Sequence, residues 1–278
     1  MLTKCLFPVG GYGTRFLPAT KAMAKEMLPV VNKPLVQYGV EEALDAGLTG
    51  MAFVTGRGKH VIADHFDVSY ELEKQISGTD KEQYLASIRD IQAKGTFSFT
   101  RQKAMNGLGH AILTGETLVN HDAFGVILAD DLCIADADEP NVMAQMVARY
   151  KQFRCSIVAV MEVPQEETSK YGVIAGNKMS DSLYQVSEMV EKPDPKDAPS
   201  NLAIIGRYIL TPDIFDILRD TPPGKNGEVQ ITDALQKQAQ SGCVIAYKFK
   251  GKRFDCGSVD GYVAATNYVY ENIYKKGS

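Results

Sequence analysis

The sequence lacks the overall positive charge that nucleic-acid and membrane-surface proteins usually carry. Its 278 residues include 30 lysines and arginines against 34 aspartates and glutamates, a formal net charge of −4. Proteins that bind nucleic acid or anionic membranes usually show a basic excess over a whole domain. We therefore expect no nucleic acid and no membrane among the partners, and any bound anion must be held by a local cluster of cations.

Paired cysteines are also missing. The five cysteines are odd in number and scattered, with no Cys-x-x-Cys pair: Cys5, Cys133, Cys155, Cys243 and Cys256. Such a set predicts neither a disulfide framework nor a zinc site. We interpret Cys256 as a packing residue.

Long hydrophobic runs are absent as well. The most apolar stretches, such as 126–129 and 157–160, have the length of strands and not of membrane-spanning helices. Proline and glycine interrupt the first eleven residues too early for the apolar core of a signal peptide. We expect a cytoplasmic protein.

What stands out instead is a basic, glycine-rich stretch at 8–34. It follows a short apolar strand predicted at 5–8, and it carries four cations against one acid. This local excess predicts a site for a strongly anionic small molecule, and a triphosphate is our interpretation. The cations are Arg15, Lys21, Lys25 and Lys33, and the acid is Glu26.

The order of predicted elements indicates an α/β fold. The strand at 5–8 is followed by a helix from 34 that ends near Gly47, and then by a buried strand at 51–55. A strand–helix–strand start implies a mainly parallel sheet covered by helices. It also places the basic loop at the carboxyl end of the first strand, where open α/β sheets bind ligands.

The rest of the chain continues this pattern and then changes. We predict a polar, partly helical excursion at 59–94 packed on the sheet edge, and an antiparallel pair of strands whose turn lies at Gly176-Asn177. The other predicted strands are 96–101, 124–129, 156–163 and 244–249, and the other helices are 107–119, 140–153, 212–218, 229–240 and 259–274.

The glycine turn matches neither of two common nucleotide-binding patterns. It lacks the third glycine of the dinucleotide fingerprint, and no acid ends the second strand, which disfavours a nicotinamide-dependent oxidoreductase. No Gly-Lys-Ser/Thr occurs, so it is not a P-loop. What remains is a loop whose N–H groups can wrap phosphates, followed by Arg15, which can donate two hydrogen bonds to a phosphate.

Nine ordered motifs carry a family resemblance over essentially the whole chain. They lie at 11–34 (including Gly-Thr-Arg-x-Leu-Pro and Lys-Glu-Met-Leu-Pro), 101–102, 107–111, 130–131, 171–173, 191–193, 200–208, 227–234 and 254–258. Together they resemble the signature of sugar-1-phosphate nucleotidylyltransferases. The form of 19–29 and the polar excursion from 64 onward are most similar to the bacterial branch that uses UTP and glucose 1-phosphate.

The resemblance implies a fold, a reaction and a metal. The fold would be a Rossmann-like, mixed but mainly parallel sheet flanked by helices, with a small antiparallel sugar-binding subdomain. The reaction would convert UTP and glucose 1-phosphate into UDP-glucose and pyrophosphate, with Mg²⁺ and without a covalent intermediate. One domain, 1–278, would comprise a nucleotide-binding half (1–163), a sugar-phosphate-binding half (164–258) and a C-terminal helix (259–278). Similar enzymes associate as homodimers or homotetramers.

Asp130 and Asp255 are the candidate metal ligands. Mg²⁺ prefers carboxylate oxygens and keeps water and substrate phosphates as its other ligands, so two acids suffice. By spacing alone, both would be turn or helix-cap residues; the resemblance implies metal binding. Asp131 and Asp233 are weaker alternatives.

Other site residues follow from the resemblance, motif by motif. It implies catalytic roles for Arg15, Lys25, Asp130, Lys192 and Asp255. The nucleotide would be bound by Gly10, Gly11, Gly13, Thr14, Arg15, Lys25, Gln102, Gly107 and Asp130. The sugar phosphate would be bound by Gly172, Glu191, Lys192, Asn201 and Ile204. Gln102 can offer both a donor and an acceptor to a pyrimidine edge. The four histidines, His60, His65, His110 and His121, show no metal spacing, and we interpret all four as structural or surface residues.

Two rivals remain. One is a thymidylyltransferase acting on the same sugar phosphate. The other is an inactive, nucleotide-sugar-sensing homologue, which would be expected to lose a metal aspartate or a phosphate-binding cation. The candidate metal aspartates and phosphate-binding cations are all present here: Arg15, Lys25, Asp130, Lys192 and Asp255.

Overall fold

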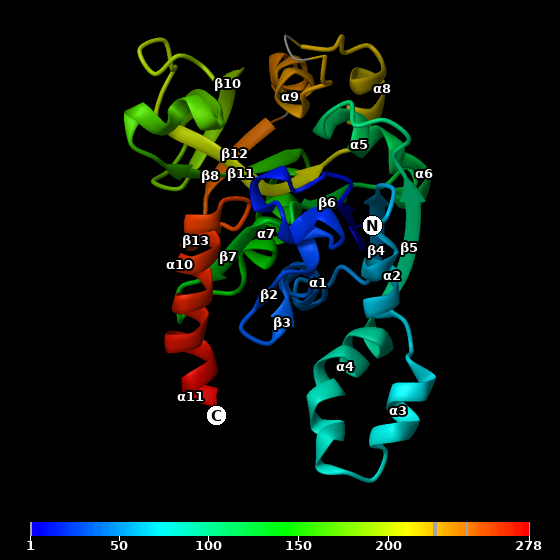
Figure 1. Cartoon of the computed structure of the whole chain (residues 1–278). Coiled ribbons are helices and arrows are strands. Elements are labelled where there is room, and N and C mark those ends of the chain that lie inside the picture. Colours follow the sequence, from blue (N-terminus) through cyan, green and yellow to red (C-terminus); the bar gives the residue numbers. More distant parts are fainter. Residues whose placement is uncertain (1, 225–226, 243, 278) are drawn as a thin grey trace.

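The computed structural model describes residues 2–224, 227–242 and 244–277, so Cys243 lies outside the described residues. Its main feature is a nine-stranded sheet in the order β5-β4-β1-β6-β11-β8-β12-β10-β9 (Figure 1). The strands are β1 (Lys4–Pro8), β4 (Gly50–Thr55), β5 (Thr96–Arg101), β6 (Phe124–Ile127), β8 (Ser156–Glu162), β9 (Gly172–Lys178), β10 (Leu183–Glu191), β11 (Leu202–Leu210) and β12 (Val244–Lys248).

The sheet is mixed, as predicted, but it is not mainly parallel: four of its neighbouring strand pairs are parallel and four are antiparallel. β1 pairs in parallel with β4 and β6, β4 with β5, and β8 with β12. β11 runs antiparallel between β6 and β8, and β9 and β10 continue the sheet as an antiparallel pair. β11 is buried along its whole length, as expected of a central strand covered on both faces.

Helices cover both faces of the sheet. One apolar cluster joins the sheet to α1 and α7, and a second joins its other face to α5, α8 and α9. The helices are α1 (Leu35–Asp45), α2 (His60–Phe66), α3 (Tyr70–Ile76), α4 (Ala86–Lys94), α5 (Leu108–Thr114), α6 (Glu116–Val119), α7 (Val142–Phe153), α8 (Ile214–Arg219), α9 (Ile231–Gln240), α10 (Val259–Val269) and α11 (Lys275–Gly277). Within the described ranges, no helix is both long and apolar enough to cross a membrane.

Short elements surround the first strand's loop. Single 3₁₀ turns at Thr14–Phe16, Ala19–Lys21 and Lys25–Met27 carry the basic stretch to a small hairpin, β2 (Pro29–Val30) with β3 (Lys33–Pro34). A separate two-stranded sheet pairs β7 (Asp131–Ala135) with β13 (Gly251–Asp255). The remaining short turns are Asp80–Leu85, Gln165–Lys170 and the π-helical Tyr270–Tyr274.

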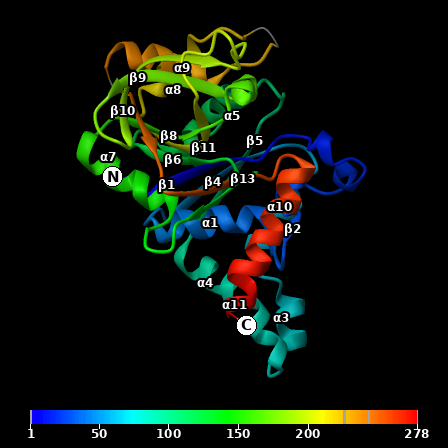
Figure 2. The same cartoon turned by 90° about the vertical axis from the view of Figure 1, so that its left-hand side faces the viewer.

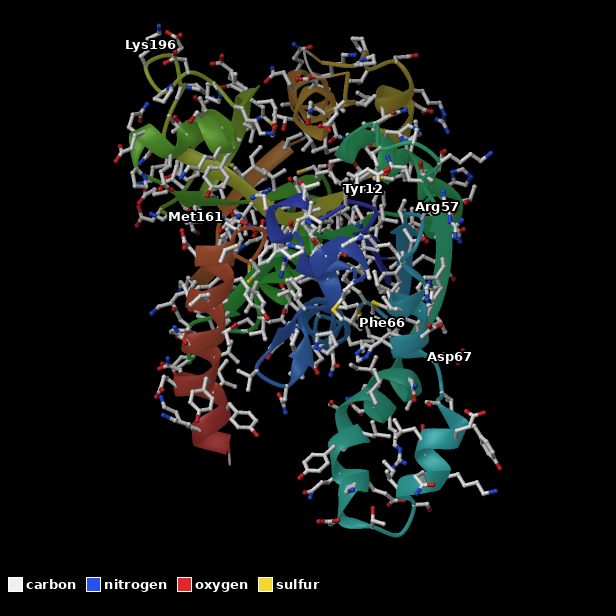
Figure 3. All side chains as sticks on the ribbon, viewed as in Figure 1. Tyr12, Arg57, Phe66, Asp67, Met161 and Lys196 are labelled. Carbon is white, nitrogen blue, oxygen red and sulfur yellow. The ribbon has the colours of Figure 1, made fainter. Side chains whose placement is uncertain are left out.

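The helical excursion does not pack on the sheet edge along its whole length, contrary to our expectation. Phe66 and Ile91 join the core, but α3 and the following 3₁₀ turn extend away from the sheet in both views (Figures 1 and 2). The chain leaves the body between Phe66 and Asp67 (Figure 3). Tyr70 and Tyr84 are 68% and 74% exposed, because no other element covers them within the described residues.

The predicted turn at Gly176-Asn177 is also wrong. β9 continues through both residues to Lys178, and the reversal follows at 179–182. Gly176 lies opposite a register shift in β10, where any side chain would overlap the Gln185 carbonyl. The glycine therefore serves close strand approach at a bulge and not a turn.

A buried ion pair links the sheet to its helices beneath the carboxyl end of β6. Arg207 of β11 donates to both carboxylate oxygens of Glu42 of α1, with Nη2···Oε2 at 2.7 Å, and both residues are buried. The same carboxylate accepts the Met143 N–H of α7 at 3.0 Å. Arg207 also donates to the carbonyl oxygens of Leu128 and Gly206. One guanidinium–carboxylate pair thus holds three elements, β11, α1 and α7, together with the turn that follows β6.

We expect Glu42→Gln to lower the free energy of unfolding by about 3–5 kcal/mol, because the guanidinium would lose its charged partner in a buried site. Urea titration followed by circular dichroism would measure the loss. Asp90→Asn, which removes the exposed pair with Lys94, is the matched control and should change stability by less than about 1 kcal/mol. Equal effects of the two substitutions would contradict the role given to the buried pair.

Candidate active site

Two neighbouring aspartates follow β6 and face different surroundings. The chain leaves β6 at Ile127, turns through 128–130 and enters β7 at Asp131. Asp131 is buried. Its carboxylate accepts a hydrogen bond from the Gly206 N–H at 2.7 Å and forms an ion pair with Arg253. The Asp130 side chain is 25% exposed and points into a cavity. Asp131 is therefore held by partners from two other strands, whereas the more exposed Asp130 is the better placed of the two to meet a ligand.

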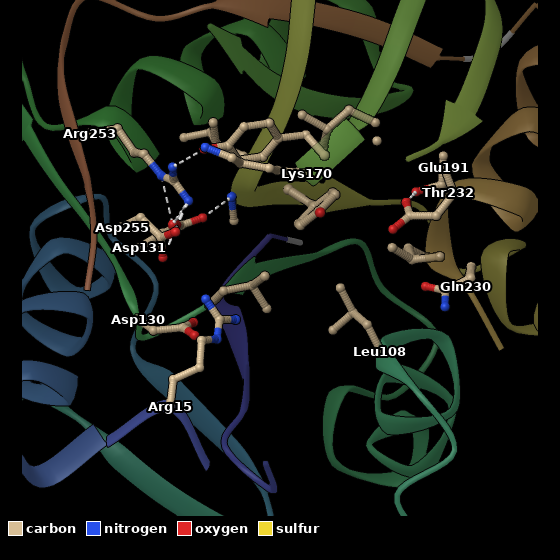
Figure 4. A pocket seen from close by; sticks show the side chains of 18 residues that line it. Arg15, Leu108, Asp130, Asp131, Lys170, Glu191, Gln230, Thr232, Arg253 and Asp255 are labelled. Atoms are coloured by element: carbon tan, nitrogen blue, oxygen red, sulfur yellow. Dashed lines mark hydrogen bonds and ion pairs between the residues drawn. The ribbon is translucent and has the colours of Figure 1, made fainter. Parts of the chain in front are cut away.

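Asp255 lies beside Asp130 although the two are far apart in sequence. It ends β13, directly opposite Asp131 in the register of the small sheet. A Cβ built on Gly257 would lie 3.0 Å from Asp130 Oδ2 and 3.0 Å from Asp255 Oδ1. The two carboxylates thus face one small space that glycine leaves open. Figure 4 shows both aspartates on the same side of the cavity.

This pair of carboxylates fits a divalent cation of the Mg²⁺ type. Hard oxygen donors suit Mg²⁺, which takes its remaining ligands from water and substrate phosphates. In the part of the chain that the structure describes, no group of three or more His, Cys, Asp or Glu side chains is placed to hold a metal. If a cation binds here, these two carboxylates could supply two donors, and water or substrate would fill the other positions. Of the alternatives, Asp131 is engaged by Arg253, and Asp233 lines a different cavity.

Lys25 forms an ion pair with Asp130. Its Nζ lies 2.5 Å from Asp130 Oδ2. Burial by itself would raise the pKa of the Asp130 carboxyl, but the Lys25 ammonium lowers it below its usual value. Burial likewise lowers the pKa of Lys25, yet Asp130 and Glu26 raise it above its ordinary value. Both groups are therefore charged at neutral pH.

A second ion pair lies next to the first. Lys59 at the start of α2 donates to Glu26 at 2.6 Å, and both side chains are buried. Burial raises the pKa of Glu26, against the lowering effect of Lys59 and Lys25. The Glu26 carboxylate is thus a buried negative charge next to Lys25, and it helps to keep the Lys25 ammonium protonated. Lys59 balances the charge of Glu26.

A cavity of about 300 Å³ brings together residues from both halves of the sequence (Figure 4). Asp130 and Asp255 line it on one side and Glu191 on the other. Arg15 extends from the basic loop toward Asp130. Of the predicted residues, the structure places Arg15, Asp130, Gly172, Glu191, Ile204 and Asp255 here.

A second cavity, of about 260 Å³, lies on the side of the glycine turn. Of the predicted residues, it is lined by Gly10, Gly11, Lys25, Gln102, Gly107 and Asp130. Gly107 precedes α5 with φ +93°, and a Cβ there would lie 2.7 Å from Glu228 Cβ. Only glycine can therefore hold this backbone against the loop at 228–229. Asp130 and two leucines, Leu108 and Leu128, line both cavities, so the two spaces meet at Asp130.

Four predicted residues line neither cavity. Lys192 has a backbone φ of +47°, and its side chain is 53% exposed. It lines a neighbouring cavity together with Glu191, and Lys192 Nζ lies 3.6 Å from Glu191 Oε1. Gly13 adopts φ +65° and shapes the loop, its carbonyl accepting the Thr20 hydroxyl at 2.7 Å. Thr14 and Asn201 are exposed.

Sequence reasoning missed several cavity residues. Arg253 pairs with Asp131 and donates to the Tyr171 hydroxyl at 3.0 Å, while Thr232 donates to Glu191 Oε2 at 2.6 Å. A signal for Arg253 was present: it lies two residues before Asp255 in a strand, so both side chains share one face. Thr232 fell within a quoted motif, but nothing in the spacing placed it beside Glu191.

The interpretation of Cys256 as a packing residue agrees with its surroundings. The thiol is buried in the cluster that seats α10, and burial raises its pKa to about 12. It is therefore a neutral thiol at physiological pH.

Comparison with known proteins agrees with this geometry. Residues 6–272 match the family model for nucleotidyl transferases. The UTP–glucose-1-phosphate uridylyltransferase of Pseudomonas aeruginosa is 67% identical, with 100% of this chain and 99% of that protein covered. The enzyme of the same name from Bacillus subtilis is 44% identical, with 95% and 89% covered.

Solved structures show the same fold. The crystal structure of an apo UDP-glucose pyrophosphorylase matches with a TM-score of 0.94 and 61% identity, and all of both chains is covered. A UDP-glucose pyrophosphorylase complexed with UDP-glucose matches with a TM-score of 0.91 and 59% identity over 98% and 99% of the two chains. The predicted fold class and family are confirmed: the chain belongs to the nucleotidyl transferase family.

Proposed function

We propose that the protein transfers a uridylyl group from UTP to α-D-glucose 1-phosphate, giving UDP-glucose and pyrophosphate. The observation that carries this proposal is the meeting of two cavities at Asp130, one lined by the glycine turn and one by Glu191. Two substrates bound from opposite sides would bring their phosphates together there. The names of the relatives that match the whole chain identify the two substrates.

The chemical problem is to bring two anions together in line. An oxygen of the sugar phosphate attacks the α-phosphorus of UTP, and the bond from that phosphorus to the bridging oxygen breaks as pyrophosphate leaves. Positioning and charge neutralisation supply most of the catalysis in such transfers. Arg15 and Lys25 reach the shared region from the basic loop and would neutralise the triphosphate.

Nucleotidyl transferases of this family generally use a divalent metal. We propose Mg²⁺ as that metal, with Asp130 and Asp255 as its protein ligands, because their oxygens face the space beside Gly257. When bound, Mg²⁺ would add positive charge where the substrate phosphates gather. Asp131, held by Arg253 and the Gly206 N–H, keeps the turn that carries Asp130 in place.

The sugar would lie against Glu191. Thr232 donates to Oε2 of this carboxylate, and Gly172 leaves room beside it, since a Cβ there would lie 3.1 Å from the same oxygen. The other carboxylate oxygen can accept from sugar hydroxyls. Lys192, adjacent to Glu191, would reach the sugar phosphate from the neighbouring cavity.

The first test is a substrate matrix that measures pyrophosphate release. We expect the highest kcat/KM with UTP and glucose 1-phosphate in Mg²⁺, and no turnover with excess EDTA. Preference for dTTP over UTP would indicate a thymidylyltransferase instead. Absence of turnover with every pair, in protein that still binds UTP, would support the nucleotide-sensing alternative.

We expect Arg15→Ala to lower kcat/KM by roughly 10²–10³, because it removes a charge-assisted contact to the transferred phosphates. Lys21→Ala, six residues along the same loop and exposed, is the matched control and should stay within about twofold of wild type. Steady-state kinetics with both substrates would measure this. An Arg15→Ala enzyme with unchanged kcat/KM would contradict the role given to Arg15.

We expect Glu191→Gln to raise KM for glucose 1-phosphate by roughly tenfold or more, with little change in KM for UTP, because the lost charge-assisted hydrogen bonds face the sugar. Thr232→Val should have the same selectivity with a smaller effect, since it removes only the donor that holds Glu191. Varying one substrate at a time measures both constants. A rise confined to KM for UTP would contradict this placement of the sugar.

A further inference from the structure

Gln102 lies at the inner wall of the cavity beside the glycine turn. It directly follows β5, and its backbone N–H donates to Thr55 O of β4 at 2.9 Å. The residue is only 5% exposed, and it lines the cavity together with Gly10 and Gly107. A buried amide with a fixed backbone is well placed to bind a ligand selectively.

The direction of the Gln102 amide follows from its neighbours. One end of the amide lies 2.7 Å from His110 Nδ1 and 3.4 Å from the Gly107 carbonyl oxygen. A carbonyl oxygen can only accept, so this end must be the Nε2 amino group. Nε2 then donates to His110 Nδ1 as well, which requires the neutral imidazole with its proton on Nε2.

His110 is itself held by its helix. It lies in α5, where the Ala111 N–H donates to the Gly107 carbonyl and the Thr114 hydroxyl donates to the His110 carbonyl at 2.8 Å. Gly107, the loop at 228–229 and α5 are packed closely, since a Cβ at Gly107 would collide with Glu228. The imidazole therefore presents its acceptor to Gln102 from a fixed support.

The other end of the amide faces the cavity without a protein donor. Gln102 Oε1 lies 3.3 Å from the position of a Cβ on Gly10, next to the open space. In the described part of the chain, no protein group donates to this oxygen. An unpaired acceptor that borders the cavity, on a residue only 5% exposed, favours a ligand that brings its own N–H.

We propose that His110 is a positioning residue that sets base selection by fixing the direction of the Gln102 amide. With Nε2 tied to His110 and Gly107, Gln102 Oε1 accepts from the base. Uracil carries an N3–H donor between its two carbonyl groups, whereas N3 of cytosine is an acceptor and would meet Oε1 with like polarity. His110 thus favours UTP over CTP without contacting either. This inference rests on the proposed function for the assignment of the cavity to a pyrimidine nucleotide.

The test is the dissociation constant for CTP divided by that for UTP. Both are measured by calorimetry on the full chain without sugar phosphate. His110→Ala removes the acceptor, and the ratio should fall roughly fivefold to tenfold, the worth of one neutral hydrogen bond. His110→Asn can place its side-chain oxygen where Nδ1 lies and should keep the ratio within about twofold. Wild type should favour UTP over CTP.

Two controls separate positioning from general damage. The affinity ratio of dTTP to UTP should be unchanged in every variant, because thymine also carries N3–H. His121→Asn alters an exposed histidine outside the cavity and should leave all ratios at wild-type values. An unchanged CTP-to-UTP ratio in His110→Ala, an equal fall in His110→Asn, or a wild type that binds both nucleotides equally would overturn the inference.

The binding experiment is independent of turnover. A wild type that prefers UTP to CTP but releases no pyrophosphate with glucose 1-phosphate would contradict the proposed function and leave the role of His110 standing. Normal turnover with UTP, together with an unchanged CTP-to-UTP ratio in His110→Ala, would support the proposed function and contradict the role of His110.

Discussion

The pair of Arg207 and Glu42 is the interaction on which the site depends. It is buried beneath the turn that carries Asp130, and it joins β11, α1 and α7 to that turn. A buried charge left without its partner costs far more than an exposed one, so these elements cannot easily separate. The shared end of the two cavities is therefore built on a support that has one favourable arrangement. Positioning to within fractions of an ångström is what a transfer between two phosphates requires.

Above that support, the charges of the site are arranged in neighbouring pairs. Lys59 balances Glu26, Lys25 balances Asp130, and Arg253 balances Asp131. Because the acids and bases are already oriented, little reorganisation is needed when anionic substrates enter. Of the loop's cations, Lys25 is neutralised by an acid from a distant part of the chain, Asp130, and the cavity near Asp130 therefore combines both signs.

Much of the fold was predictable because its patterns are local. The apolar run of β1 and the one-sided apolar face of α1 identify a strand and a helix from a few residues each. The excursion at 59–94 was harder: its scattered apolar residues predict helices but do not show whether anything covers them, and Tyr70 and Tyr84 are exposed. Gly176 misled for a similar reason. A glycine that permits close strand approach looks, in sequence, like a glycine that permits a turn.

The sequence by itself determined the family, the element order and the motifs that carry the candidate residues, since these depend on residue type and spacing. Only the tertiary structure decided which of those residues meet. It brought Asp255 beside Asp130, gave Asp131 to Arg253, placed Thr232 against Glu191 and joined His110 to Gln102. The physical reason is that a hydrogen bond or an ion pair depends on ångström-scale distances in space. Residues that are far apart in the sequence become partners only when the sheet and its helices are assembled.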